Sequence, residues 1–214
     1  MKVGIIGSGE VGQHLGIGFA ATGHTVRIGS REPSHEKLTK WKASAGANAS
    51  TGTFEEAARF GELVVVATLW SGTENALRLA GAGNFAGKVV IDSTNPLVFR
   101  ENAPPGLALG HTDSGGEQVQ RWLPNSHVVK AFNIVGNGDM FRPTFAGGPP
   151  DMFFCGNDAA AKKSVSGILQ SFGWNAIDIG GIEGARVLES LCMLWVGYMF
   201  STGSQHHALK MLHG

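Results

Sequence analysis

The stretch that decides the fold is KVGIIGSGEVG, from Lys2 to Gly12. Its first half is a short apolar run, which is typical of a buried strand, and its second half carries Gly7, Gly9 and Gly12 in a GxGxxG spacing. In this motif the first glycine allows a tight turn, the second lets the backbone approach a pyrophosphate, and the third lets the helix pack close to the strand. The stretch therefore predicts a strand, a glycine loop and a helix that together bind a dinucleotide.

Outward from this stretch, apolar runs alternate with segments of helical period. Further strands are expected at HTVRIG, LVVVATL, KVVIDS and HVVKAF, with helices over residues 10–21, 34–45, 72–80 and 114–123. A loop containing Pro104 and Pro105 is expected between the last two of these strands. Near-continuous valine and isoleucine indicate strands buried on both faces, so the predicted fold is α/β, with a doubly wound parallel sheet.

The C-terminal third repeats this alternation after a loose, glycine- and proline-rich stretch at residues 136–150. We expect a strand at DMFFCG, a helix in NDAAAKKSVSGILQSFG, a strand at NAIDIG and a long helix over residues 183–202. These elements either extend the sheet or form a small annex. The domain prediction is a Rossmann NADP-binding domain at residues 1–146 and a substrate-side annex at residues 147–214.

Composition limits the partners. The 214 residues carry 17 basic and 17 acidic side chains without a basic run, so nucleic acid and anionic membranes are not expected as partners. The expected partner is a small molecule.

The location is expected to be cytoplasmic, because MKVGIIGSG leaves no room for a secretory apolar region. The apolar segment VLESLCMLWVGYMF includes Glu189 and is shorter than the roughly 20 residues that cross a bilayer, which favours a buried helix. Cys155 and Cys192 are expected as buried thiols.

The end of the second expected strand predicts which dinucleotide binds. Ser30 follows Gly9 by 21 positions, close to the spacing of about 20 at which a carboxylate commonly binds the adenosine ribose. Here the chain has Gly29, Ser30 and Arg31 instead, and the last two can donate hydrogen bonds to a 2′-phosphate. The sequence therefore predicts NADP(H), with Arg31 on a solvated loop as the alternative interpretation.

The remaining strand ends should face the same ligand, because ligands of open parallel sheets bind outside the carboxyl ends of the strands. Polar or aromatic side chains at these ends are candidates for contacts with the ribose and the nicotinamide. Trp70 flanks the nicotinamide or covers the sheet edge, and the two asparagines contact the ligand or cap their loops. The candidates are Thr68, Leu69, Trp70, Asn95 and Asn133.

Six motifs in order, GSGEVG, GSRE, STNP, KAFN, FFCGNDAAAKKSV and RVLESLCMLW, resemble the NADPH-dependent reductases of coenzyme F420, a deazaflavin. They also resemble the dinucleotide-binding domain of the animal transmembrane ferric reductases. The resemblance implies that Ser8, Glu10 and Val11, with the glycines, bind the pyrophosphate and that Ser30 and Arg31 bind the 2′-phosphate. It further implies that the C-terminal part helps to form the deazaflavin pocket, with Met140, Phe141 and residues 188–198 as candidate contacts. Leu69 stands where members often have proline.

Hydride transfer between a nicotinamide and a flavin-like acceptor requires two rings held in contact, and no acid, base or metal. No catalytic residue and no metal ligand is therefore predicted. A carbonyl or imine acceptor would need a general acid, for which His111 and Asp113 are the nearest candidates, while His206 and His207 lack a third ligand. The prediction is an NADPH-dependent oxidoreductase with coenzyme F420 or another flavin as co-substrate. Two alternatives remain: a reductase of another small acceptor, and an NADPH-binding sensor or presenting module without turnover. A homodimer is a further expectation.

Overall fold

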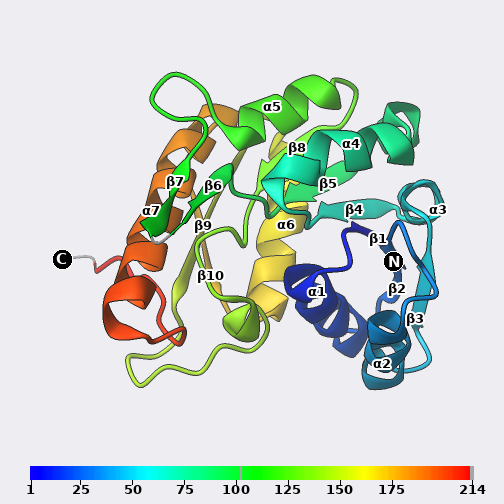
Figure 1. The fold of residues 1–214 in the computed structure, drawn as a ribbon, viewed down its shortest axis with the longest axis horizontal. Coiled ribbons are helices and arrows are strands. Elements are labelled where there is room, and N and C mark those ends of the chain that lie inside the picture. The colour runs from blue at the N-terminus through cyan, green and yellow to red at the C-terminus, as the bar shows by residue number, and fades with distance from the viewer. Residues whose placement is uncertain (102, 213–214) are drawn as a thin grey trace.

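The computed structural model describes residues 1–101 and 103–212 and shows an α/β protein built on one large sheet (Figure 1). Strands and helices alternate along most of the chain. In chain order the elements are β1 (Lys2–Ile6), α1 (Glu10–Ala21), β2 (Thr25–Gly29), α2 (Glu36–Ala45), β3 (Ala49–Gly52), α3 (Phe54–Phe60), β4 (Leu63–Val66), α4 (Trp70–Ala80), η1 (Ala82–Phe85), β5 (Val89–Asp92), β6 (Leu97–Arg100), β7 (Ala103–Leu107), α5 (Gly115–Trp122), β8 (His127–Lys130), η2 (Asn137–Asp139), β9 (Asp151–Gly156), α6 (Ala159–Ser171), β10 (Asn175–Asp178), η3 (Ile182–Gly184) and α7 (Ala185–Thr202).

The large sheet has eight strands in the order β10-β9-β8-β5-β4-β1-β2-β3. Its pairs are parallel except for β8 with β9, which are antiparallel. The order runs outward in both directions from β1 and β4, which confirms the predicted doubly wound sheet. Strands β9 and β10 extend this sheet, so the C-terminal third continues it. The domain boundary at residue 146 stays a prediction.

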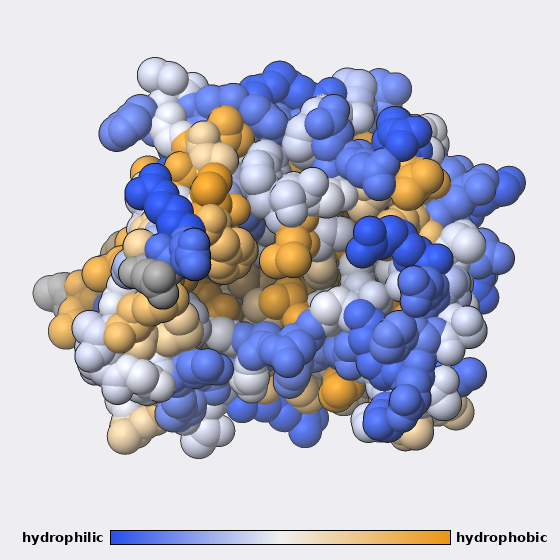
Figure 2. All heavy atoms as spheres, viewed as in Figure 1, coloured by the Kyte–Doolittle hydropathy of each residue, from blue (hydrophilic) through white to orange (hydrophobic). Residues whose placement is uncertain are grey.

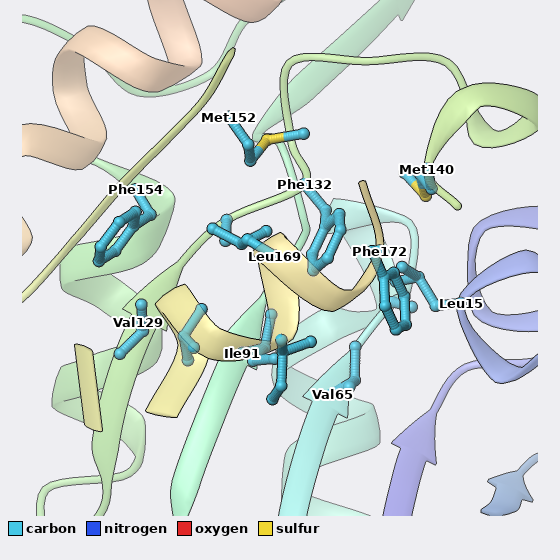
Figure 3. Packing of buried hydrophobic residues seen from close by; sticks show 14 of the residues in the cluster. Leu15, Val65, Ile91, Val129, Phe132, Met140, Met152, Phe154, Leu169 and Phe172 are labelled. Atoms are coloured by element: carbon cyan, nitrogen blue, oxygen red, sulfur yellow. The ribbon is translucent and has the colours of Figure 1, made fainter. Parts of the chain in front are cut away.

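Helices cover both faces of the sheet, because successive side chains of each strand point to opposite faces. On one face Val65, Ile91 and Val129 belong to a buried cluster that includes residues of α1, α2 and α6. Figure 3 shows Leu15 of α1 and Leu169 of α6 among them. On the other face Val64 and Val90 pack with residues of α3, α4 and α5. This alternation explains why the strand sequences are continuous runs of valine and isoleucine.

Three elements differ from the sequence prediction. The expected loop with Pro104 and Pro105 is instead a two-stranded antiparallel hairpin, β6 with β7, which lies against α7 (Figure 1). Proline cannot donate to a strand ladder, so it argues against a strand unless the strand is at an edge, as β7 is here. Strand β3 and helix α3 were not predicted. Their segments, ASTG and FEEAARF, are too short to show a clear period.

The segment after α7 returns along the protein. It is bonded to the start of β9, where the Asp151 N–H donates to the carbonyl oxygen of Leu209 at 3.0 Å. Lys210 donates to the carbonyl oxygen of Gly147 at 2.9 Å. In the described ranges, no helix combines the length and the apolar character that crossing a bilayer requires.

Candidate functional site

The glycine loop joins β1 to α1, and its three glycines have different surroundings. Gly7 has a φ of +124°, and a Cβ on it would lie 2.2 Å from the carbonyl oxygen of Ala67. A Cβ on Gly12 would lie 2.2 Å from the carbonyl oxygen of Gly7, whereas a Cβ on Gly9 would meet no atom within 4 Å. The turn and the helix packing thus require Gly7 and Gly12. The open space at Gly9 fits a pyrophosphate lying against the backbone.

The first turn of α1 is open to an anion. Gly9 is the N-cap, and in the part of the chain that the structure describes no side chain caps the helix at this end. Backbone N–H groups and the helix dipole therefore favour negative charge there. Gln13 fixes the loop by donating from Nε2 to the carbonyl oxygen of Ser8 at 3.0 Å. The carboxylate of Glu10 accepts a hydrogen bond of 2.7 Å from Asn137, which ties α1 to the segment after β8.

Ser30 is buried at the end of β2 and oriented by two hydrogen bonds. Its Oγ accepts from the hydroxyl of Ser8 at 3.1 Å and from the N–H of Glu32 at 3.2 Å. Since both bonds use the oxygen as acceptor, the hydroxyl hydrogen of Ser30 is left to donate to another group. Arg31 is exposed, and in the described part of the chain its guanidinium has no hydrogen-bond or ion-pair partner. The two side chains therefore fit the prediction of a phosphate site.

A carboxylate is excluded at Gly29 by packing. A Cβ there would lie 2.9 Å from Cβ of Ala57 and 3.0 Å from Cα of Phe54, both on α3. An aspartate at this position, which would repel a 2′-phosphate, cannot fit without moving α3. Nearby, His35 caps α2 by accepting from the N–H of Lys37, and both residues are exposed.

The end of β4 combines fixed polar groups with one exposed apolar side chain. Thr68 and Thr73 share a hydrogen bond of 2.8 Å between their hydroxyls. Leu69 is 73% exposed at the N-cap of α4. The ring of Trp70 stacks on Trp122 of α5 with centroids 5.5 Å apart, so it covers the junction of α4 and α5. Contact of Trp70 with a nicotinamide stays a prediction.

The two asparagines at the ends of β5 and β8 bind each other. Asn95 donates to the carbonyl oxygen of Asn133 at 2.8 Å, and Asn133 donates to Oδ1 of Asn95 at 2.9 Å and to the carbonyl oxygen of Leu188 at 3.0 Å. The preceding residue, Phe132, has a φ of +64°, a strained value for a bulky side chain of the kind that clusters at functional sites. Among the residues that the structure describes, the buried Oδ1 of Asn133 has no hydrogen-bond partner, which is unusual for a buried polar atom.

Sequence reasoning missed a cluster of buried charges behind these asparagines. Asp92, Lys130 and Glu189, here called the buried triad, are each no more than 1% exposed. Nζ of Lys130 lies 2.9 Å from Oδ2 of Asp92 and 2.8 Å from Oε1 of Glu189. Burial alone would lower the pKa of Lys130, but the two carboxylates outweigh it and raise that pKa. The sequence did contain a signal for this cluster, because Asp92 and Lys130 are charged residues that each end an apolar strand.

The candidate general acid is not free to donate a proton. Asp113 pairs with Arg121 at 2.7 Å, and hydrogen bonds from Arg121, the Ser114 N–H and Gln118 overcome the effect of burial and lower the pKa of Asp113. It is therefore an anion at neutral pH. His111 is exposed and has a φ of +59°.

The adjacent histidines His206 and His207 lie in the segment after α7. His206 pairs with Asp139 at 2.9 Å, and the ring of His207 stacks on Trp195 with centroids 4.6 Å apart. In the described ranges, no group of three or more His, Cys, Asp or Glu side chains could hold a metal ion.

Several other candidates belong to the core. Burial raises the pKa of the Cys155 and Cys192 thiols to about 12, so they stay protonated, and both cysteines are free. Met140 is 2% exposed and lies in the core with Phe172 (Figure 3). Phe141 packs edge-on against Phe172 with ring centroids 5.1 Å apart. Figure 2 shows a hollow with hydrophobic atoms along it near the middle of the face where the hairpin and the start of α1 lie.

Comparison with known proteins shows which family the chain resembles. The family model described as "NADP oxidoreductase coenzyme F420-dependent" matches residues 2–96. An F420-dependent NADP reductase from Methanocaldococcus jannaschii is 30% identical over 92% of this chain and 92% of its own length. Metalloreductase STEAP3 of Rattus norvegicus is also 30% identical, but the chain spans only 36% of its length. A crystal structure from Arthrobacter sp. FB24, provisionally named an F420-dependent NADP reductase, covers all of both chains at 36% identity with a TM-score of 0.92.

Proposed function

The chain belongs to the coenzyme F420-dependent NADP oxidoreductase family and is an NADP-dependent oxidoreductase, and on that premise we propose that it moves a hydride between NADPH and a flavin-like acceptor, coenzyme F420 or a related ring. The proposal has two parts, the way in which the protein holds NADPH and the chemistry of the acceptor.

NADPH would be held along the carboxyl ends of the central strands. The backbone at Gly9 and the first turn of α1 bind the pyrophosphate, and Ser30 and Arg31 bind the 2′-phosphate. Asn133 presents its unpaired Oδ1 to a donor on the nicotinamide half. Each group is supported by a local observation: open space at Gly9, a free hydroxyl hydrogen on Ser30, and an acceptor without a partner on Asn133.

The observation that carries the choice of acceptor is the chemistry of the side chains near the nicotinamide end. At the strand ends expected to face the nicotinamide, the side chains are a leucine, a tryptophan, a threonine and two asparagines. The charged groups behind them, Asp92, Lys130 and Glu189, are buried and paired with one another, and Asp113, in the loop before α5, is held as an anion by Arg121. The bound nucleotide supplies the hydride, so the protein has only to orient two rings and exclude water. A carbonyl or imine acceptor would instead need a proton donor. Exposed Leu69 offers an apolar contact that suits a flat ring.

An acceptor screen tests the proposal. Purified protein is mixed with NADPH and, in separate reactions, with coenzyme F420, FMN, FAD, a cyclic imine or a ferric chelate, and the loss of NADPH absorbance is followed. We expect acceptor-dependent oxidation with the deazaflavin or a flavin and little with the imine. Oxidation with the imine alone would support the reductase of another acceptor. Tight NADPH binding without oxidation by any acceptor would support the sensor or presenting module.

A further inference from the structure

The buried triad carries a net negative charge. Its carboxylates are stabilised as ions by backbone and hydroxyl donors: Asp92 accepts from the N–H and the hydroxyl of Thr94, and Glu189 accepts from the N–H groups of Gly115 and Gly116. Lys130 is held as an ammonium by the two carboxylates, as the raised pKa indicates. Two carboxylates and one ammonium give the buried triad a formal charge of minus one.

The buried triad adjoins the end of the site where the nicotinamide is expected. Asp92 is the last residue of β5 and Lys130 the last residue of β8, and Asn95 and Asn133 stand three positions beyond them. Glu189 reaches the same place from α7. Oε1 of Glu189 lies 3.0 Å from the position of a Cβ on Gly115, and ring atoms of Trp70 and Pro96 lie 3.1 and 3.4 Å from it.

Stability alone does not account for such a cluster. Moving charges out of water is costly, and buried ion pairs can often be replaced by apolar residues without loss of stability. Sequestered charge does act strongly on a nearby ligand, because a buried position screens it poorly. The two forms of the coenzyme differ in charge at this end, since the oxidised nicotinamide ring is a cation and the reduced ring is neutral.

We propose that the net negative charge of the buried triad favours binding of NADP⁺ relative to NADPH and so lowers the reduction potential of the bound coenzyme. The triad would thereby favour NADPH as the hydride donor. This inference rests on the proposed function in one respect, the presence of NADP(H) at the ends of β5 and β8, and it does not depend on the acceptor.

The test varies the charge of the buried triad while keeping its shape. Glu189→Gln and Asp92→Asn each remove the net charge, whereas the double variant Lys130→Met with Glu189→Gln restores it by removing one charge of each sign. Glu55→Gln, an exposed carboxylate on α3, is the control. For each protein the dissociation constants of NADP⁺ and NADPH are measured by calorimetry, and near-UV circular dichroism checks the fold.

We expect the ratio of the NADP⁺ to the NADPH dissociation constant to rise on the order of tenfold in each single variant, as for one unit charge about 10 Å away at an effective dielectric constant of about 20. It should return towards the wild-type value in the double variant and stay unchanged in the control. A purely structural role would weaken both nucleotides together, so an unchanged ratio in folded single variants overturns the inference, as does a double variant that fails to restore it. Wild-type protein that binds neither nucleotide would instead overturn the proposed function itself.

Discussion

Replacing Arg31 by alanine should weaken the binding of NADPH far more than that of NADH. Arg31 is exposed and without a partner in the described part of the chain, so its removal breaks no contact within the protein. Ser30 beside it is oriented by Ser8 and by the Glu32 N–H, and these bonds do not involve the guanidinium. The change therefore removes a ligand contact without disturbing the fold.

The expected magnitude follows from one charge-assisted hydrogen-bonding contact. Hydrogen bonds to charged groups contribute about 1.5–3 kcal/mol, which corresponds to a loss of about 10- to 150-fold in the affinity for NADPH. Arg31 is exposed, so salt screens the interaction, and the loss should lie near the lower end at physiological ionic strength. Ser30→Ala removes a single neutral donor to the phosphate and should cost less, about 0.5–1.5 kcal/mol.

Calorimetric titration of wild-type and variant protein with each nucleotide at two salt concentrations measures these losses. Arg59→Ala is the matched control, because Arg59 is an exposed arginine whose ion pair is with Glu55 on its own helix. Affinity for NADH should be nearly unchanged in all three variants. Equal weakening of NADPH and NADH in Arg31→Ala would remove this residue from the phosphate site and refute the reasoning.

Three further predictions concern binding, stability and assembly. Gly9→Val should fold but lose both nucleotides, whereas Gly12→Val should fail to give a stable protein because its Cβ has no room; an undiminished affinity in Gly9→Val would contradict the pyrophosphate site. Hydrogen bonds from Arg186 lower the pKa of Glu117, so this pair stabilises the protein above the ordinary glutamate pKa and loses its effect as the pH falls through the folded value. Glu117→Gln should lower the free energy of unfolding by about 1 kcal/mol at neutral pH and by less in acid, and a loss independent of pH would contradict the sign. The homodimer stays a prediction: Leu194→Lys, on the exposed face of α7, should shift sedimentation towards the monomer, and a wild-type monomer at every concentration would exclude it.

Local chemistry allowed the main fold to be predicted from the sequence. The strand, glycine loop and helix at the N-terminus form where the spacing of Gly7, Gly9 and Gly12 indicates. Gly7 and Gly12 stand where a Cβ has no room, and Gly9 leaves open space beside the backbone. The continuous valine and isoleucine of β4 and β5 likewise show strands with two covered faces. The hairpin of β6 and β7 was missed because prolines in a strand mislead a reading based on local preference.

The buried triad could not be predicted, because its members meet only through the topology. Asp92 and Lys130 are 38 positions apart and become neighbours because β5 pairs with β8. Glu189, in an apolar helix, indicated from the sequence only that the segment is not a membrane anchor. The positive φ of Phe132 could not be predicted from the sequence either, because it results from the tertiary fold and not from any preference of phenylalanine.

The most direct test of the proposed function is the reduction of coenzyme F420 by NADPH with the purified protein, followed by the absorbance of both compounds in the absence of oxygen. We expect the absorbance changes to show equal amounts of NADPH oxidised and coenzyme F420 reduced, with NADH a much poorer donor and with activity greatly reduced in Gly9→Val. Tight NADPH binding with no reduction of the deazaflavin or of any flavin would contradict it.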